Sequence, residues 1–181
     1  MTELVGNLNY LISLGMLLMN IATVFLVVVY FRADRVPGGG DITEFLKKWG
    51  IQLAFLVSAA ATGVSLYYSE VLGFPPCSLC WFQRIFQFPL TALLALASWK
   101  RDVEISIYVI LLAALGLIPA LYQHVMQVAN LGTLPCPAGS GVGADCAQRL
   151  VFEFGFMTMP WWAVSLFAFV IVLMFFVRRK I

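Results

Sequence analysis

The sequence has few charged residues and only one histidine. Of its 181 residues, 11% are charged and 62% are hydrophobic, whereas an average soluble domain carries about 25% charge. This composition excludes a soluble globular protein. A net charge of +2 gives no support for nucleic-acid binding. The start of the chain lacks the basic segment of a signal peptide, because Glu3 stands there before a long apolar run. We therefore expect that first run to be retained as a membrane helix.

Five apolar runs are long enough to cross a lipid bilayer. They cover about residues 8–31, 50–72, 77–99, 105–129 and 159–177. Each is close to or longer than the roughly 18 to 20 residues that a spanning helix needs. The pattern predicts an all-α membrane protein with five spans.

The basic residues are distributed unevenly between these runs. Nine of the eleven Lys and Arg lie in residues 32–48, 100–101 and 178–180, and the other two are Arg84 and Arg149. Five crossings place the nine on one side, which the positive-inside rule identifies as the cytoplasm. The sequence thus predicts a multi-pass protein of the cell (inner or plasma) membrane, with its N-terminus outside and its C-terminus in the cytoplasm.

All four cysteines fall on the side away from the basic residues. They are Cys77, Cys80, Cys136 and Cys146. Disulfides persist outside the cytoplasm and are reduced within it. An even number of cysteines, all on the oxidising side, argues against four incidental buried thiols.

Cys77 and Cys80 form a CxxC motif where one helix ends and the next begins. Pro75 and Pro76 stop the preceding helix. Cys77 would then lie beside the first free N–H groups of the next helix, where the helix dipole favours a thiolate. Arg84 follows Cys80 by four residues, so the two share a helix face. The motif suggests a redox-active pair beside a cation, although a metal knuckle or two inert thiols would have the same spacing.

Cys136 and Cys146 have a different setting, a loop that contains Gly139, Gly141 and Gly143. Such a loop would let the pair approach another protein or the CxxC motif. A structural disulfide that pins the loop is the alternative. A site of four cysteine ligands for zinc fits poorly, because such sites use two closely spaced pairs.

Two ionisable residues lie inside the expected spans. His124 is near the outer end of the fourth span, and Arg84 is near the start of the third. Ionisable groups within spans are functional candidates. The alternatives are a histidine at the membrane interface and an arginine that extends to the lipid headgroups.

Taken in order, these motifs resemble the DsbB family of membrane disulfide bond formation proteins. The resemblance covers about residues 50–180. It rests on the two cysteine pairs, Arg84, Tyr122-Gln123-His124, Asp145-Cys146-Ala147-Gln148-Arg149 and Met159-Pro160-Trp161-Trp162. It implies a four-helix transmembrane redox core at residues 50–181, preceded at 1–49 by an extra helix and a cytoplasmic linker. The extra helix and the short loop between Cys136 and Cys146 depart from the usual family pattern.

The resemblance also implies an activity. A protein of this kind re-oxidises a DsbA-like thioredoxin-fold partner and passes the electrons to a membrane quinone, ubiquinone or menaquinone. By the same resemblance, the partner attacks Cys136, Cys146 attacks Cys77, and Cys80 faces the quinone. Arg84 would then polarise a quinone carbonyl, and His124 would assist with a hydrogen bond.

Two other functions are open. Vitamin K epoxide reductases also combine four helices with two cysteine pairs, but there the loop pair precedes the CxxC motif. A non-enzymatic membrane metal carrier would use the thiols as soft ligands, but no methionine- or histidine-rich cluster lies near the cysteines.

Overall fold

The computed structural model describes residues 2–130 and 145–179 and consists of long helices. They are α1 (Thr2–Arg32), α2 (Gly39–Leu66), α3 (Ser78–Lys100), α4 (Ser106–Val128) and α5 (Met159–Arg178). A short 3-10 helix (Ala33–Arg35) joins α1 to α2, and a π-helical turn (Tyr67–Val71) extends α2. All five long helices, α2 together with its π-helical extension, are long and apolar enough to span a membrane. The prediction of an all-α protein with five helices of spanning length is confirmed, since the described part of the chain forms no strand.

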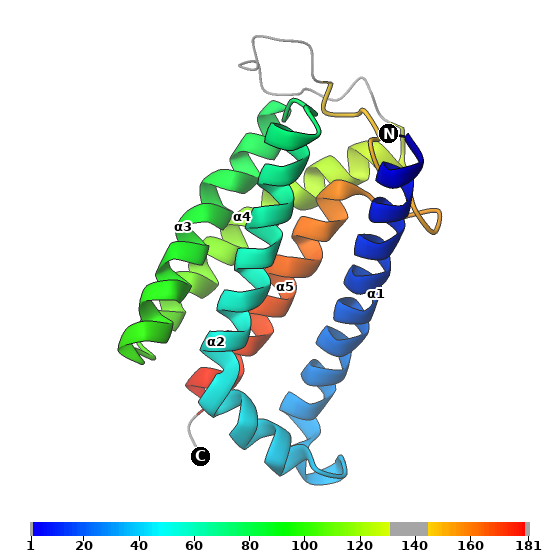
Figure 1. Ribbon diagram of the computed structural model, residues 1–181. Helices are drawn as coiled ribbons and strands as arrows, with labels where there is room; N and C mark the ends of the chain where they lie inside the picture. The colour runs from blue at the N-terminus through cyan, green and yellow to red at the C-terminus, as the bar shows by residue number, and fades with distance from the viewer. Residues whose placement is uncertain (1, 131–144, 180–181) are drawn as a thin grey trace.

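Helices α2 to α5 form a four-helix bundle, and α1 lies outside it (Figure 1). In the bundle α5 packs against both α2 and α4, while α3 packs against α2 and α4. Helix α5 is the most enclosed of the five. Helix α1 packs mainly against α5, with a smaller contact to α2. The extra helix is therefore an addition to one side of the bundle.

Helix α2 begins at Gly39, eleven residues before the expected start of its apolar run. Ile42, Leu46 and Gly50 follow one another at intervals of four and lie on the inward face, where Leu46 and Gly50 are buried. This spacing is that of an amphipathic helix. Lys47 and Lys48 interrupt the apolar run without interrupting the helix. The helix start predicted from the apolar run, at residue 50, is therefore too late.

The core of the bundle is packed closely around α5. Phe167, Leu173 and Phe176 have no exposed surface. Opposite Phe167 stands Gly116 of α4, and a Cβ atom at that position would lie 2.5 Å from the Phe167 ring. The absence of a side chain at Gly116 thus lets α4 and α5 approach each other.

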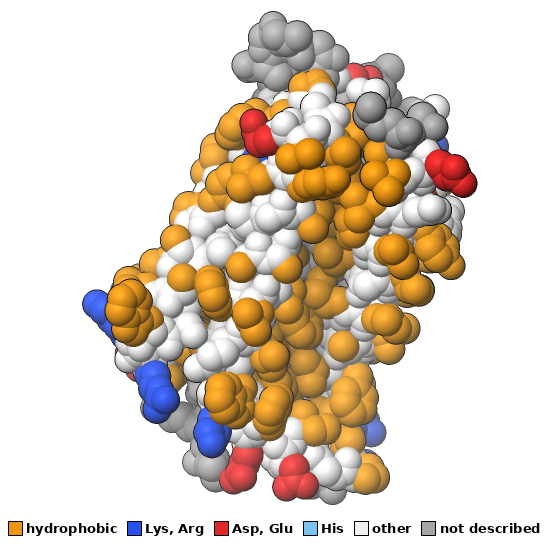
Figure 2. Space-filling view, viewed as in Figure 1, with side chains coloured by type: hydrophobic (Ala, Val, Ile, Leu, Met, Phe, Trp, Pro, Cys, Tyr) orange, Lys and Arg blue, Asp and Glu red, His pale blue; other side chains and the backbone are white. Residues whose placement is uncertain are grey.

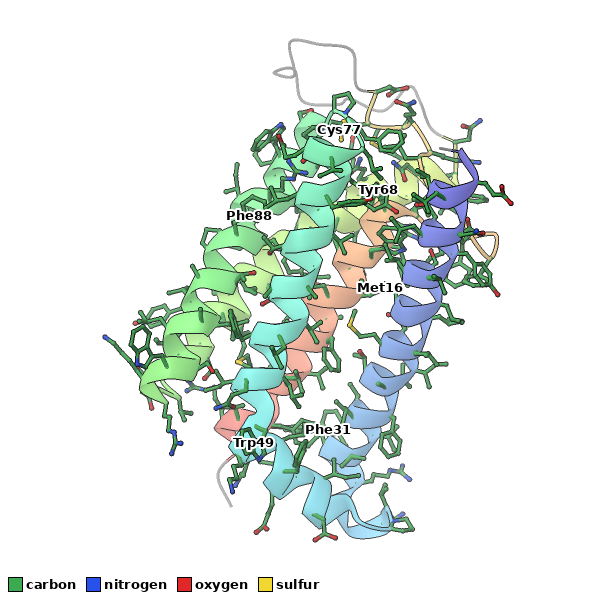
Figure 3. All side chains as sticks on the ribbon, viewed as in Figure 1. Met16, Phe31, Trp49, Tyr68, Cys77 and Phe88 are labelled. Carbon is green, nitrogen blue, oxygen red and sulfur yellow. The ribbon has the colours of Figure 1, made fainter. Side chains whose placement is uncertain are left out.

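The two ends of the bundle differ in character. The chain termini lie at opposite ends (Figure 1). Most of the Lys and Arg side chains visible in Figure 2 lie in its lower half, at the end of the bundle where α3 ends and α2 begins (compare Figure 1). Cys77, at the start of α3, lies at the other end (Figure 3).

Candidate functional site

The CxxC motif forms the start of α3. Residues 73–77 are not helical, and Cys77 caps the helix because its sulfur accepts a hydrogen bond from the Cys80 N–H at 3.3 Å. The two sulfur atoms lie 2.6 Å apart, and both cysteines are free thiols. A disulfide bond is about 2.05 Å long, so oxidation of this pair requires only a small movement.

Cys77 is almost completely buried, with 4% of its surface exposed. Its hydrogen bond with Cys80, together with burial, raises the pKa of the Cys77 thiol above its ordinary value. The backbone N–H of Cys80 lowers the pKa of Cys77, as expected for a helix N-terminus, but the hydrogen bond with the Cys80 thiol and burial oppose it. The neutral thiol is favoured there because desolvation and the shared hydrogen outweigh the N–H groups of the first helical turn.

Two buried glutamines of α4 face the cysteines. Gln123 donates from Nε2 to the sulfur of Cys77 at 3.1 Å and to the sulfur of Cys80 at 3.6 Å. The same amide group also lies 3.3 Å from the carbonyl oxygen of Cys146. Gln127 donates to the carbonyl oxygens of Cys146 at 3.2 Å and Gln148 at 2.9 Å. The α4 glutamines therefore connect the CxxC motif with the segment that carries Cys146.

Cys146 is completely buried and disulfide-bonded. It belongs to one buried cluster with Cys77, Leu79 and Met126, and its sulfur lies 3.7 Å from the hydroxyl oxygen of Ser78. The structure thus brings Cys146 to the start of α3. Cys136, the other predicted cysteine of this pair, lies outside the described residues.

Arg84 is buried beside the CxxC motif, with 7% of its surface exposed. Its Nε donates to the Ser65 hydroxyl at 3.0 Å, and its Nη2 donates to the Ser65 carbonyl at 2.7 Å and the Ser69 hydroxyl at 2.9 Å. The guanidinium carbon also lies over the rings of Trp81 and Phe88, 5.3 and 6.0 Å from the ring centroids. Arg84 is held inside the protein and does not extend to the lipid headgroups.

A cavity of about 150 Å³ connects these groups. Its polar side is formed by Cys77, Cys80, Arg84 and the buried glutamines of α3 and α4. Its apolar side includes Met16, Val64 and Leu166, together with the aromatic residues Tyr68 and Trp162. An apolar pocket with a few convergent polar groups is the usual form of a small-molecule site.

His124 is not among the described residues that line this cavity. Its Nδ1 lies 2.9 Å from the hydroxyl of Thr158, which caps the start of α5, and its ring lies 4.5 Å from that of Trp161. The structure therefore places His124 in the contact between α4 and α5, while it brings Cys77, Cys80 and Arg84 together.

Sequence reasoning missed the glutamines of the site. Gln83 and Gln87 of α3, like Gln123 and Gln127 of α4, are buried and repeat at four-residue spacing. Polar side chains at this spacing inside an apolar span mark a face that is turned away from lipid, and this signal could have identified them. Within residues 2–130 and 145–179 no three His, Cys, Asp or Glu side chains cluster as metal ligands do.

The chain is similar in sequence to several known proteins. The model of the disulfide bond formation protein DsbB family matches residues 47–177, which excludes α1. The SPbeta prophage-derived disulfide bond formation protein B of Bacillus subtilis is 36% identical over 128 residues, 71% of this chain and 84% of that protein. The probable disulfide formation protein C 1 of Bacillus anthracis is 36% identical over 139 residues, 76% of this chain and 97% of its own length.

The probable disulfide formation protein of Chlamydia trachomatis is 38% identical over 117 residues, 65% of this chain and 83% of that protein. No solved structure shows significant similarity to the chain. The family match covers most of the chain and includes the CxxC motif, Arg84, both α4 glutamines and Cys146. This match and the similarity to these relatives show that the chain belongs to the DsbB family of membrane disulfide bond formation proteins.

Proposed function

We propose that this protein is a thiol:quinone oxidoreductase that re-oxidises a DsbA-like thioredoxin-fold partner and transfers the electrons to a membrane quinone. One observation carries the proposal. The two CxxC sulfurs lie 2.6 Å apart on the wall of a cavity that also contains the buried cation of Arg84. A dithiol that can close to a disulfide therefore lies on the cavity that we propose as the site of the electron acceptor.

The distribution of charge supports an orientation for this chemistry. The CxxC motif lies at the end of the bundle opposite most of the visible Lys and Arg side chains (Figures 2 and 3). With the basic end in the cytoplasm, both cysteine pairs face the compartment in which exported proteins form disulfides.

The first exchange reaction involves the partner and the loop cysteines. A thiolate of the reduced partner attacks Cys136 in the Cys136–Cys146 disulfide, which forms a partner–Cys136 bond and releases Cys146. The second thiol of the partner then attacks the partner sulfur of this mixed disulfide. The partner leaves with its own disulfide, and Cys136 and Cys146 are both reduced.

The second exchange reaction joins the two pairs of cysteines. Cys146 attacks Cys77 in the oxidised CxxC motif, which breaks the Cys77–Cys80 bond and releases Cys80 as a thiolate. Cys136 then attacks Cys146, restoring the loop disulfide and leaving Cys77 and Cys80 reduced. The hydrogen bonds from Gln123 and Gln127 to the Cys146 carbonyl support this step, because they hold the attacking cysteine beside α3.

Re-oxidation of the CxxC dithiol releases two electrons and two protons, and a quinone bound in the cavity supplies their acceptor. The residues that line the cavity fit such a molecule. The apolar side formed by Met16, Val64 and Leu166 suits a lipid-soluble ring. The Arg84 guanidinium favours negative charge on an oxygen or on the Cys80 sulfur, because its three hydrogen-bond acceptors are neutral. A quinone in this cavity would have no contact with His124, because His124 is not among the described residues that line it.

The proposal is tested with cysteine variants of the purified protein. Cys146→Ala should abolish oxidation of the thioredoxin-fold donor, while dithiothreitol, which can reduce the CxxC disulfide directly, still supports quinone reduction. Cys80→Ala should abolish quinone reduction with either reductant. A Cys80→Ala protein that reduced quinone at the wild-type rate would exclude the role assigned to Cys80.

A further inference from the structure

Helix α1 lies outside the part of the chain that matches the family, yet it contributes to the redox cavity. Met16 of α1 lines the cavity together with Tyr68 and Trp162 of the bundle. Figure 3 shows Met16 on α1 and Tyr68 in the region between α1 and α2, and Met16 packs against the buried cluster that contains both aromatic residues. The wall of the cavity thus has a component that the four-helix core does not provide.

Two buried polar contacts attach α1 at this level. The Tyr68 hydroxyl donates a hydrogen bond to Oδ1 of Asn9, and Nε1 of Trp162 donates to the Ser13 hydroxyl at 3.2 Å. Asn9 is 7% exposed and Ser13 has no exposed surface. Asn9, Ser13 and Met16 follow one another at helical spacing and therefore lie on one face of α1. Both partners of α1 in these contacts are themselves cavity-lining side chains.

The opposite face of α1 is apolar and exposed. Leu11 and Leu18 are 63% and 60% exposed, and a helix of this length and hydropathy is suited to lipid. Asn9 and Ser13 would be unfavourable on that face, because polar groups lose hydrogen bonds in hydrocarbon. The polar residues of α1 therefore specify how the helix is attached to the bundle.

We infer that α1 is the lipid-side wall of the redox cavity and limits access of membrane-soluble molecules to Cys80. Asn9 and Ser13 are positioning residues that keep this wall closed by holding Tyr68 and Trp162, while Met16 supplies part of the inner surface. The inference extends the proposed function, in which the molecule that reaches Cys80 from the membrane is a quinone. Its test uses no quinone and so does not depend on that proposal.

The experiment measures alkylation of Cys80 in the reduced, purified full-length protein by a long-chain, lipid-soluble maleimide. Peptide mass spectrometry separates Cys80 from the other cysteines. Asn9→Leu and Ser13→Ala should each accelerate the reaction by about fivefold. Each variant loses one hydrogen bond that attaches α1, so the fraction of molecules in which α1 has moved away from the cavity increases. Met16→Trp should slow it by about fivefold or more, because the indole occupies space in the small cavity. Leu18→Trp, on the exposed face of the same helix, is the matched control and should react as the wild type does.

A small water-soluble maleimide distinguishes opening toward lipid from unfolding. The anchor variants should keep wild-type rates with this reagent, whereas an unfolded protein would react faster with both reagents. If an anchor variant does not fold, the comparison of Met16→Trp with Leu18→Trp tests the inference instead. Met16→Trp should slow the alkylation of Cys80, whereas Leu18→Trp should leave it unchanged. Equal Cys80 reactivity in these two variants would overturn the inference. Loss of quinone reduction in the wild-type protein would instead overturn the proposed function and leave these rates unaffected.

Discussion

Arg84 is a buried cation that makes its direct hydrogen bonds to neutral oxygens. The hydroxyl of Ser69, which accepts one of them, donates in turn to the exposed carboxylate of Glu70 at 2.9 Å. The Ser69 hydroxyl therefore stands between the Glu70 carboxylate and the Arg84 guanidinium. A cation held in this way keeps its attraction for negative charge that develops in the adjoining cavity.

Replacing Arg84 with methionine tests this role. Arg84→Met preserves much of the side-chain length and removes the charged donors, so the apparent KM for quinone should rise by about 10- to 100-fold. Steady-state titration of the purified variant with quinone measures the change. Lys100→Met, at the exposed end of the same helix, is the control and should leave the KM as it is. If Arg84→Met had the KM and kcat of the wild type, Arg84 would have only a structural role.

The glutamines show a part of the site for which the sequence can indicate the residues but not the contacts that they make. The CxxC motif, Arg84 and Cys146 could be predicted because their residue types carry known chemistry. Gln123 and Gln127 have no such chemistry of their own, and their role depends on a contact with Cys146 across a loop. That contact is set by the packing of the folded chain and by no local pattern of residues.

Gln127 should affect the exchange between the cysteine pairs more than the reaction at the CxxC motif. Gln127→Leu removes both hydrogen bonds to the carbonyls of Cys146 and Gln148. We expect donor-driven turnover to fall about tenfold or more relative to dithiothreitol-driven turnover. The fall should appear in kcat, because the apolar cavity side chains proposed to hold the quinone ring are retained. Parallel assays with the two reductants give the ratio.

Gln52→Leu provides the matched control for this experiment. Gln52 lies on α2, and its buried Oε1 has no hydrogen-bond partner among the described residues. The ratio of the two turnover rates should therefore stay at the wild-type value. The role of Gln127 would be contradicted if Gln127→Leu and Gln52→Leu gave the same ratio.

At the level of the helices, the sequence predicted the elements well, because all their boundaries except the starts of α1 and α2 lie within one residue of the ends of apolar runs. Helix α3 follows Pro75 and Pro76, and α5 begins at Met159, beside the Thr158 cap. The start of α2 was placed too late because that part of the helix is amphipathic. The attachment of α1 could not be predicted either, since Asn9 and Ser13 are isolated polar residues whose partners lie far along the chain.

The contact between α4 and α5 depends on Gly116. A Cβ atom there would lie 2.5 to 2.9 Å from three atoms of the Phe167 ring, which is completely buried and has no free space to enter. Gly116→Ala should therefore destabilise the bundle by about 1 to 3 kcal/mol. Reversible unfolding in mixed detergent measures this change.

Gly63→Ala on α2 is the control for Gly116→Ala, because a Cβ atom at Gly63 meets nothing within 4 Å. Alanine is favoured over glycine within a helix, so this variant should be neutral or more stable by about 0.4 to 1 kcal/mol. Similar stabilities for the two variants would mean that the contact between Gly116 and Phe167 does not limit the packing of α4 on α5.

For the whole molecule, the charge pattern and the cysteines define two unlike ends. Nine of eleven basic residues lie in the segments that five crossings place together, and the CxxC motif lies at the opposite end of the bundle. Cys77 and Cys146 are 69 positions apart in the sequence yet share one buried cluster. Their proximity is a property of the complete bundle, because α3 and α4 must both be in place to produce it.

The proposed orientation predicts how the cysteines react in intact cells. After mild reduction, a membrane-impermeant maleimide should label Cys136 from outside, because the basic loops hold the other end of the bundle in the cytoplasm. Labelling is read by mass spectrometry of the purified protein. A cysteine introduced at exposed Arg101 serves as the cytoplasmic control and should react only in broken cells. Labelling of Cys136 only after the membrane is broken would reverse the orientation.

The central claim is that electrons pass from a thioredoxin-fold donor through both cysteine pairs to a quinone. The most direct measurement follows donor oxidation and quinone reduction together in the purified full-length protein in detergent. The account predicts one quinone reduced for each donor disulfide formed, and no sustained turnover in Cys80→Ala or Cys146→Ala. Donor oxidation without quinone reduction, or coupled turnover that survives the loss of Cys80, would contradict it.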